Sequence, residues 1–249
     1  MRGRRILRRN HTTPSAAGVL DLSTLSLTLW VDGDSGMVTG KASAGTSGSL
    51  NLTATGSPAA GAGLDGGGTL LLDGVNDKLS YSLSNGAGDI YSDAAYTFAA
   101  VAKVTSIPTD LAVTSAFSNA GLSQESGGNH ALAFASTGPT LQAYQNTVGG
   151  LKIKTLTTAT STWKIFQMRF TGTALEIRDD GGAWQSSTFA STTASSFTFR
   201  TFYIGTDYTG AAQFLTGELA EILATNTALD DATMNNVVAS LRAKYPSIP

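Results

Sequence analysis

The amino-acid sequence predicts an all-β fold, in which two antiparallel sheets stack as a sandwich and one helix follows at the C-terminal end. Three observations predict this class. Short segments with a two-residue hydrophobic period recur through most of the 249 residues, and only the last segment changes to a helical period. Serine, threonine and glycine make up more than a third of the chain, while 41% of residues are hydrophobic, enough to build a core.

The first predicted strand covers residues 25–31, where leucine and valine alternate with serine, threonine and tryptophan. This alternation predicts that Leu25, Leu27, Leu29 and Val31 share the buried face of one strand. A turn cluster follows at residues 32–36, and residues 36–68 are expected to form long loops with one short strand near residues 50–52. Similar patterns predict strands at 69–73, 78–83, 96–105, 111–117, 131–135, 140–144, 151–156, 163–170, 174–178, 197–204 and 214–224.

The helical segment is predicted at about residues 230–245. Its apolar residues fall on one helical face: Met234, Val237, Val238, Leu241 and Tyr245. Asp230 or Asp231 is suited to cap the start, and Pro246 is suited to end the helix. We therefore expect this helix to pack against the sandwich.

Charge divides the chain into a basic arm with its linker, residues 1–20, and a weakly acidic domain, residues 21–249. The arm carries five arginines and no acid in its first ten residues, whereas the rest of the chain has a net charge of −7. Such a tail is typical of segments that dock on phosphate or on an acidic protein surface. We expect it to bind a partner through Arg2, Arg4, Arg5, Ile6, Leu7, Arg8 and Arg9.

Composition excludes several functional classes. The chain has no cysteine, so disulfides, thiolate catalysis and cysteine-based zinc sites are absent. It has only two histidines, of which His130 is expected to be an ordinary strand residue. No run of about 18 apolar residues occurs, so no membrane span is expected. The apolar pair at residues 6–7 is too short for the core of a secretion signal.

Several stretches of the chain resemble a known family in their order. They are 27–32 with its Trp-Val-Asp ending, 72–79 (LDGVNDKL), 96–103, Trp163 with 174–182, 202–205, 217–222 (GELAEI) and 241–245 (LRAKY). Together they resemble the concanavalin A-like lectin/glucanase superfamily, in the laminin-G-like jelly-roll branch found in phage virion proteins. The resemblance covers roughly residues 21–246 and implies a two-sheet antiparallel jelly roll.

The resemblance also implies a test for catalysis. Hydrolases of the family carry an E-x-D-x-E triplet on one strand, which this chain lacks. The nearest approach is Glu218 and Glu221, which are three residues apart and are therefore expected to point to opposite faces of a strand. We expect no enzymatic activity.

Two kinds of binding site can be considered. Calcium would need several converging oxygen ligands, and the weak candidates are Asp32, Asp34, Asp73, Asn76, Asp77, Asp179 and Asp180. Their turn contexts favour a structural role, so no cofactor is expected. A glycan would need aromatic rings and polar groups, which Trp184, Tyr208, Tyr144 and Asn146 could supply. The alternative is that Trp30, Trp163 and Trp184 belong to the core or its rim.

Two functions are compatible with these patterns. The first is a non-enzymatic structural virion protein, such as a capsid decoration, head fibre or tail-associated module. It would be attached to other virion proteins by the basic arm, as part of an extracellular particle and as a homo-oligomer within that assembly. The alternative is a lectin-like carbohydrate-binding or adhesion module that recognises a cell-surface glycan. Nucleic acid is the less favoured partner, because the acidic domain would resist close approach to phosphates.

Overall fold

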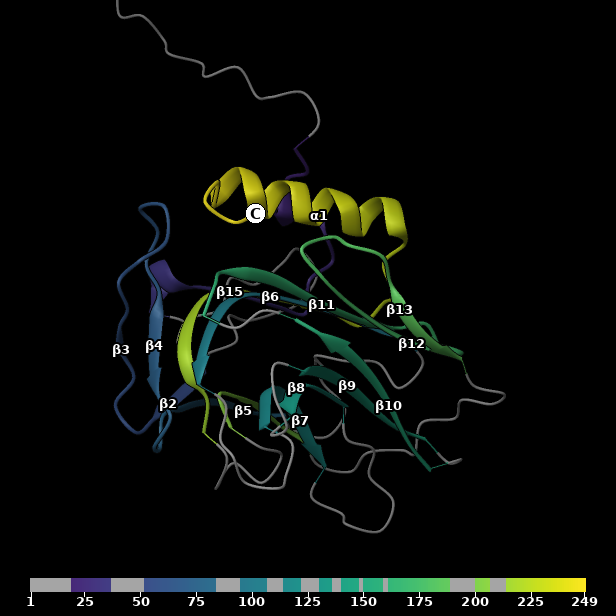
Figure 1. Cartoon of the computed structure of the whole chain (residues 1–249), viewed down its shortest axis with the longest axis horizontal. Helices are drawn as coiled ribbons and strands as arrows, with labels where there is room; N and C mark the ends of the chain where they lie inside the picture. The colour runs from purple at the N-terminus through teal and green to yellow at the C-terminus, as the bar shows by residue number, and fades with distance from the viewer. Residues whose placement is uncertain are drawn as a thin grey trace, which may run out of the picture.

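The computed structural model describes residues 19–36, 52–83, 95–106, 114–121, 130–135, 140–147, 150–158, 161–188, 200–206 and 214–249. Within these ranges the chain forms two stacked antiparallel sheets with one helix laid across the outside of the upper one (Figure 1). The predicted all-β jelly-roll sandwich is therefore confirmed.

The upper sheet, which we call the helix-covered sheet, has the strand order β13-β12-β11-β6-β15-β4-β3, and β1 also pairs with β15. Its strands are β1 (Leu29–Asp32), β3 (Ala59–Ala60), β4 (Leu70–Asp73), β6 (Tyr96–Ser106), β11 (Lys164–Phe170), β12 (Ala174–Asp179), β13 (Gln185–Thr188) and β15 (Thr216–Thr225).

The other sheet, which we call the second sheet, has the order β10-β9-β8-β7-β14-β5-β2. Its strands are β2 (Thr53–Thr55), β5 (Lys78–Leu83), β7 (Thr114–Gly121), β8 (His130–Ala135), β9 (Thr140–Thr147), β10 (Gly150–Thr157) and β14 (Arg200–Ile204). β3 and β13 were not predicted, because both are short and largely exposed and lack an alternating apolar pattern.

The space between the sheets holds the main core. Strand β6 shows how the sequence builds it, because its alternate residues Tyr96, Phe98 and Ala100 are almost completely buried in the cluster between the sheets. The Tyr96 and Phe170 rings lie 5.7 Å apart in a tilted arrangement. The intervening residues Ala99 and Val101 face the other way and belong to a separate cluster beneath the helix.

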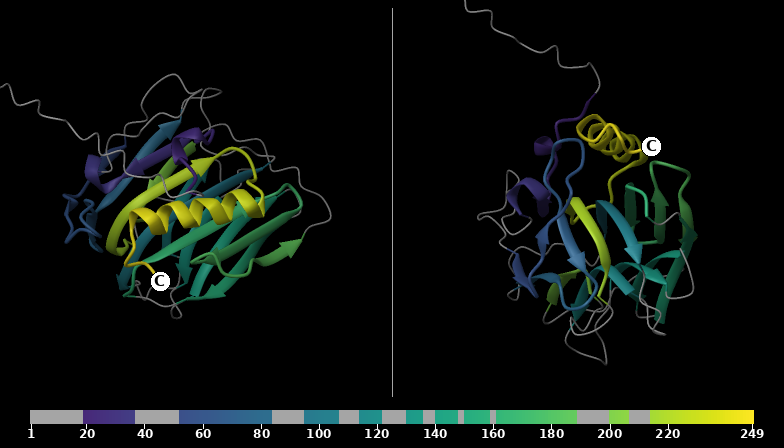
Figure 2. Two further views of the ribbon diagram at one scale, coloured as in Figure 1. Left: turned by 90° about the horizontal axis from the view of Figure 1, so that it is seen from above. Right: turned by 60° about the vertical axis from the view of Figure 1, so that its left-hand side comes forward.

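The helix α1 (Asp231–Lys244) confirms the predicted segment and its packing. Asp230 is the N-cap, and its side chain accepts a hydrogen bond from Thr233 N at 2.7 Å. The outer cluster joins this helix to the sheet beneath it and contains Ala99, Val101, Ile165, Ala220, Leu223, Val237, Val238, Leu241 and Tyr245. Seen from above, the helix lies across the strands of the helix-covered sheet (Figure 2).

The strand predicted at residues 25–31 is wrong in its first half. Leu29 and Val31 enter the inner core as expected, but Leu27 belongs to the outer cluster, with Leu25 packed against it. The cause is a tight turn, in which Leu27 N donates to Leu25 O at 2.8 Å. This turn breaks the two-residue alternation, so the strand begins only at Leu29.

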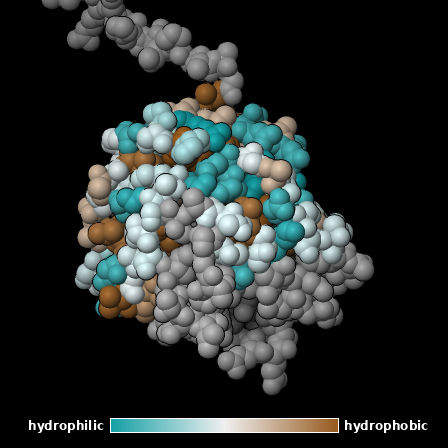
Figure 3. Space-filling view, in the orientation of Figure 1, coloured by the Kyte–Doolittle hydropathy of each residue, from teal (hydrophilic) through white to brown (hydrophobic). Residues whose placement is uncertain are grey.

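No helix in the described part of the chain is long and apolar enough to cross a membrane. On the side shown in Figure 3, apolar residues appear as separate spots on the coloured surface rather than as one patch. The large apolar side chains that remain exposed among the described residues are Val19, Leu71 and Val75.

Candidate functional site

The outer face of the second sheet lies on the opposite side of the sandwich from α1 (Figure 1). One row of directly opposed residues crosses all seven of its strands. In sheet order from β2 to β10, this row is Thr53, Ser80, Tyr203, Ser118, Ala131, Tyr144 and Ile153. We call these residues the register row.

The burial of neighbouring residues shows that the register row lies on the outer face of the second sheet. Leu79 and Ile204 are fully buried in the inner core, and they adjoin Ser80 and Tyr203. Because successive side chains in a strand alternate between faces, Ser80 and Tyr203 belong to the outer face. Both are partly exposed, and Thr53 at the end of the row is exposed.

A lysine accompanies the aromatic ring at this end of the row. Lys78 Nζ lies 5.6 Å from the centroid of the Tyr203 ring, in the range of a cation–π contact. Lys78 is opposite the exposed Thr55 of β2. The described side chains here therefore combine an aromatic ring, three hydroxyl-bearing neighbours and one positive charge.

Two of the four residues predicted for a glycan site fall at positions on this outer face. Leu141 and Ala143 of β9 are fully buried, while Gln142 between them is partly exposed. By the two-residue alternation, positions 144 and 146 fall on the same outer face as Gln142. The positions of the predicted Tyr144 and Asn146 thus share a face with Tyr203. Tyr203 itself was not predicted as a site residue, although the apolar Phe202 and Ile204 on either side of it indicate that its side chain faces away from the core.

The charge of this sheet differs from that of the chain as a whole. Its seven strands contain no aspartate or glutamate, although the chain has 18 acidic residues. They do contain basic residues, at Lys78, Lys152, Lys154 and Arg200. Hydroxyl and amide side chains dominate the outer positions, so this face is chemically suited to a neutral or anionic ligand rich in hydroxyl groups.

Trp184 lies apart from this face, on the helix-covered side. Its indole ring lies 4.4 Å from the guanidinium of Arg169 and 4.2 Å from that of Arg178, and Nε1 donates to Asp231 Oδ1 at 3.0 Å. These contacts tie Trp184 to the first turn of α1 and support the rim alternative for this residue. The predicted quartet is therefore not one site, and Tyr208 lies outside the described residues.

The expected orientation of Glu218 and Glu221 is wrong. In the pairing of β15 with β6, Glu218 is opposite Lys103 and Glu221 is opposite Val101, and the register shifts between Leu219 and Glu221. This β-bulge adds one residue to β15, so two acids three positions apart reach the same outer face of the helix-covered sheet. A bulge of this kind has no signature in the sequence.

Both acids are bound by neighbouring protein groups. Glu218 accepts hydrogen bonds from Lys103 Nζ at 2.8 Å, Ala62 N at 2.9 Å and Thr69 Oγ1 at 3.0 Å. Burial raises the pKa of Glu218, but these hydrogen bonds and the charge of Lys103 outweigh it, and the net pKa lies below its usual value. Glu218 is therefore held as a carboxylate in an internal ion pair.

Glu221 is completely buried beneath the end of α1. It accepts from Trp30 Nε1 at 2.7 Å, Lys244 Nζ at 2.7 Å and Tyr245 Oη at 2.9 Å. Burial, together with the adjacent Glu221 carboxylate, raises the pKa of Tyr245 above its ordinary value, so the phenol stays a donor. This cluster links the sheet to the helix.

The calcium candidates are spread over several turns and bind local groups. Asp73 Oδ1 accepts from Val75 N at 2.8 Å, and Asp77 accepts from Ser57 N at 2.7 Å and Asp73 N at 3.1 Å. The hydrogen bond from Val75 lowers the pKa of Asp73. Asp179 and Asp180 both form ion pairs with Lys164. Asp34 accepts a hydrogen bond from Gly68 N, and Asp32 Oδ2 lies 3.9 Å from Lys244 Nζ.

Asn76 N donates to Asp73 Oδ1 at 3.3 Å, within the turn that joins β4 to β5. Within the ranges that the structure describes, no three histidine, cysteine, aspartate or glutamate residues are grouped as metal ligands. That the chain binds no calcium stays a prediction. The arm residues, from Arg2 to Arg9, also lie outside the described part of the chain, so their predicted role stays a prediction.

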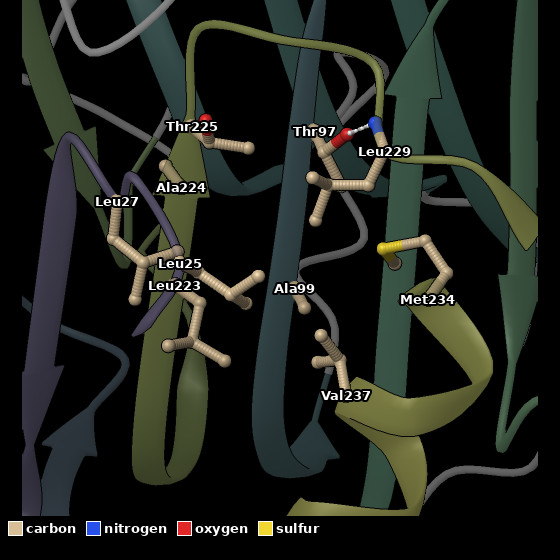
Figure 4. A pocket seen from close by; sticks show the side chains of 10 residues that line it. All are labelled: Leu25, Leu27, Thr97, Ala99, Leu223, Ala224, Thr225, Leu229, Met234 and Val237. Carbon is tan, nitrogen blue, oxygen red and sulfur yellow. Dashed lines mark hydrogen bonds between the residues drawn. The ribbon is translucent and has the colours of Figure 1, made fainter. Parts of the chain in front are cut away.

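A small apolar pocket lies between α1 and the helix-covered sheet (Figure 4). It is lined by Leu25, Leu27, Thr97, Ala99, Leu223, Ala224, Thr225, Leu229, Met234 and Val237. It has room for about one water molecule, and it offers few polar groups. This pocket is a packing gap under the helix rather than a site for a glycan.

Comparison with known proteins shows the fold. No family model matches the sequence, and no curated protein matches it. Among solved structures, the receptor-binding domain of botulinum neurotoxin C/D mosaic serotype matches with a TM-score of 0.64 and 12% identity, over 86% of this chain and 51% of that one. The chain spans about half the length of the neurotoxin domains that it matches.

Two further matches carry bound sugars. Domain 4 of AbnA, a GH43 extracellular arabinanase from Geobacillus stearothermophilus, in complex with arabinotriose, matches with a TM-score of 0.62 and 15% identity, over 86% of this chain and 98% of that domain. The botulinum neurotoxin serotype D ligand-binding domain in complex with N-acetylneuraminic acid gives a TM-score of 0.62 and 12% identity, over 86% and 50% of the respective chains. At these identities the likeness establishes a shared sandwich fold.

Proposed function

We propose that this protein is a carbohydrate-binding module that recognises a glycan through the outer face of its second sheet. The observation that carries the proposal is the register row, which sets Tyr203 and position 144 on one acid-free face among hydroxyl and amide residues. Sugars present apolar C–H surfaces and hydroxyl groups together, so they suit a face that offers both rings and polar groups.

The spacing of the row matches a linear glycan. Tyr203 and Tyr144 are separated by three strand steps, through Ser118 and Ala131. Neighbouring strands lie about 4.7–4.9 Å apart, so the two tyrosine positions are roughly 14 Å apart. Small residues stand between them in the row. A chain of sugar units laid across the strands would therefore meet an aromatic residue at each end and little obstruction between them.

The structural neighbours support a sugar ligand in a general way. Two of them are complexes with a sugar, arabinotriose in one and N-acetylneuraminic acid in the other. These ligands belong to those proteins. They justify testing arabino-oligosaccharides and sialylated glycans first. Lys78, which lies on the outer face beside the Tyr203 ring, favours the sialylated ligand of the two.

The test is glycan-array screening followed by calorimetry with the best ligand. We expect Tyr203→Ala to weaken binding by at least tenfold, because it removes the ring, and Tyr203→Phe to retain most of the affinity. Thr173→Ala, in the exposed turn after β11 of the helix-covered sheet, is the matched control and should bind normally. Equal affinity of the wild type and Tyr203→Ala would place the binding site elsewhere.

We propose that this binding occurs without hydrolysis. The Glu218 carboxylate accepts a hydrogen bond from Lys103, and the Glu221 carboxylate accepts hydrogen bonds from Trp30, Lys244 and Tyr245, so both acids are engaged by groups of the protein itself. Incubation with the bound glycan and with β-glucans, galactans and bacterial polysaccharides should release no reducing ends. Turnover that disappears in Glu218→Gln or Glu221→Gln would overturn this part of the proposal. A virion role would require the basic arm, and particle incorporation after deletion of residues 1–12 is its separate test.

A further inference from the structure

Lys78 stands beside the register row, at the end where Tyr203 lies. It comes two residues before Ser80 on β5, and Leu79 between them is fully buried, so the strand alternation places Lys78 on the outer face. Lys78 is opposite Thr55 of β2. Lys78 and Tyr203 are partly exposed, and Thr55 is exposed. A ligand in solution can therefore reach this lysine and the ring beside it.

The two ends of the register row differ in charge. At one end, Lys78 Nζ lies 5.6 Å from the centroid of the Tyr203 ring. At the other end, the positions that share the outer face with Tyr144 along β9 are occupied by Gln142 and Asn146, which carry no charge. The row therefore has a basic end and a neutral end.

The acid that precedes Lys78 in the sequence is used within a turn. Asp77 is buried, and its carboxylate accepts hydrogen bonds from Ser57 N at 2.7 Å and Asp73 N at 3.1 Å. The strands of the second sheet contain no aspartate or glutamate of their own. The strands that carry the row therefore place a positive charge, and no negative one, on this face near Tyr203.

The contact between Lys78 and the Tyr203 ring can be exchanged for a contact with an anion. A cation–π contact at an exposed site is weak, whereas a hydrogen bond from an ammonium to a carboxylate or sulfate is charge-assisted and stronger. The flexible stem of a lysine lets its ammonium turn from the ring to such a group. The same movement would uncover the ring for the apolar side of a sugar.

We propose that Lys78 selects glycans that carry an anionic sugar unit, and that this unit binds at the Tyr203 end of the register row. This inference rests on the proposed function, because it assigns specificity within the same face. The sugar ring packs on Tyr203, and its carboxylate or sulfate accepts a hydrogen bond from Lys78 Nζ. The neutral units extend across the small residues of the row towards Tyr144. The bound chain therefore has a fixed direction on the sheet.

The test is calorimetry with lactose, sialyllactose and sulfated lactose, which share a neutral core. The two anionic probes distinguish a carboxylate from a sulfate as the group that Lys78 binds. We expect the wild type to bind at least one of them about tenfold more tightly than lactose, as one charge-assisted hydrogen bond would supply. Lys78→Met keeps the apolar stem and should lose this preference while binding lactose as the wild type does. Lys78→Gln should behave in the same way, and Lys78→Arg should keep the preference.

Lys154→Met is the matched control. Lys154 lies at the other edge of the second sheet, opposite the fully buried Ala143, so its position has the inward phase of the alternation. This variant should keep the preference of the wild type for the anionic probe.

Three results would overturn the inference: lactose binds as tightly as both anionic probes, neither anionic probe binds, or Lys78→Met and Lys78→Gln keep the preference. The proposed function is judged separately, by the glycan array and by Tyr203→Ala. If lactose binding is lost in Tyr203→Ala and the wild type shows no preference for charge, the glycan face stands and the role of Lys78 is wrong.

Discussion

The two sheets of this sandwich use polar residues in opposite ways. The helix-covered sheet uses two of its acids in internal ion pairs: Glu218 pairs with Lys103 of the neighbouring strand, and Glu221 pairs with Lys244 of α1. The second sheet has no acid in any of its strands and presents hydroxyls, amides and tyrosine positions on its outer face. The comparison teaches that one outer face of the fold uses its charges to bind its own helix and strands, whereas the other carries polar residues that the helix does not cover.

The largest effect on stability is expected from removing the helix that covers one of the two sheets. Deleting residues 230–249 would expose the outer cluster, in which Val237, Val238 and Leu241 are almost fully buried. Burial of each such side chain stabilises by ~1.5–3 kcal/mol, so the loss approaches the whole stability of a domain. We expect insoluble protein or no cooperative melting transition. The control is Val75→Ala, at an exposed turn position, which should melt like the wild type. An unchanged melting curve for the truncated protein would show that the helix does not pack stably on the sheet.

The next largest effect is expected at Glu221. Glu221→Ala leaves Lys244, Trp30 and Tyr245 without their shared acceptor at a fully buried position. Removing one partner of a buried ion pair costs about 3–5 kcal/mol. Chemical denaturation should show a loss of that order, and Glu221→Gln should lose less. Asp65→Asn is the control, because Asp65 is exposed and its carboxylate binds Ser247 rather than the Glu221 cluster. A loss below about 1 kcal/mol in Glu221→Ala, as for an ion pair at the surface, would mean that the cluster does not hold the helix.

The predictions from sequence were correct where the hydrophobic period of an element continues without a break. They were wrong where a turn or a bulge in the backbone interrupts that period. The spacing of Met234, Val237 and Leu241 predicted the helix and its buried face, because nothing interrupts a regular helix. Leu27 was assigned to the wrong layer because a tight turn precedes β1. Glu221 was assigned to the wrong face because a bulge adds one residue to β15. Turns and bulges of this kind depend on tertiary contacts that a single sequence does not encode locally.

Among the residues predicted for the candidate site, some predictions were likewise correct and others wrong. Tyr144 and Asn146 were predicted from their residue types, and they share the face of Tyr203 because strand periodicity carries through β9. Trp184 was chosen for the same reason but lies on the other side of the sandwich, where two arginines and Asp231 surround it. Residue type alone could not separate them. The pairing order of the strands, which brings β14 beside β7, decides which residues share a face.

A smaller effect is expected from the titration of Glu218. Its folded-state pKa is lowered, so the unfolded state takes up a proton at higher pH than the folded state does. The stabilisation is therefore fully present above the unfolded-state pKa and is lost as the pH falls from that value through the folded-state pKa. Glu218→Gln should be less stable than the wild type at pH 7, and the difference should shrink in the acid range. A difference that stays constant with pH would mean that the Lys103 pair contributes nothing through charge.

The smallest effect is expected at the start of α1, where the helix meets the rim of the helix-covered sheet. Asp230 caps the helix through a 2.7 Å hydrogen bond from Thr233 N, and this bond lowers the pKa of the exposed carboxyl. Asp230→Ala removes the acceptor for a free backbone donor, so Tm should fall measurably but by less than in Glu221→Ala. Asp230→Asn keeps a capping oxygen and should lie close to the wild type. The cap lies on the helix-covered side and not on the second sheet, so Asp230→Ala should bind the glycan with unchanged affinity. A loss of both Tm and glycan affinity in this variant would show that the two faces are not independent.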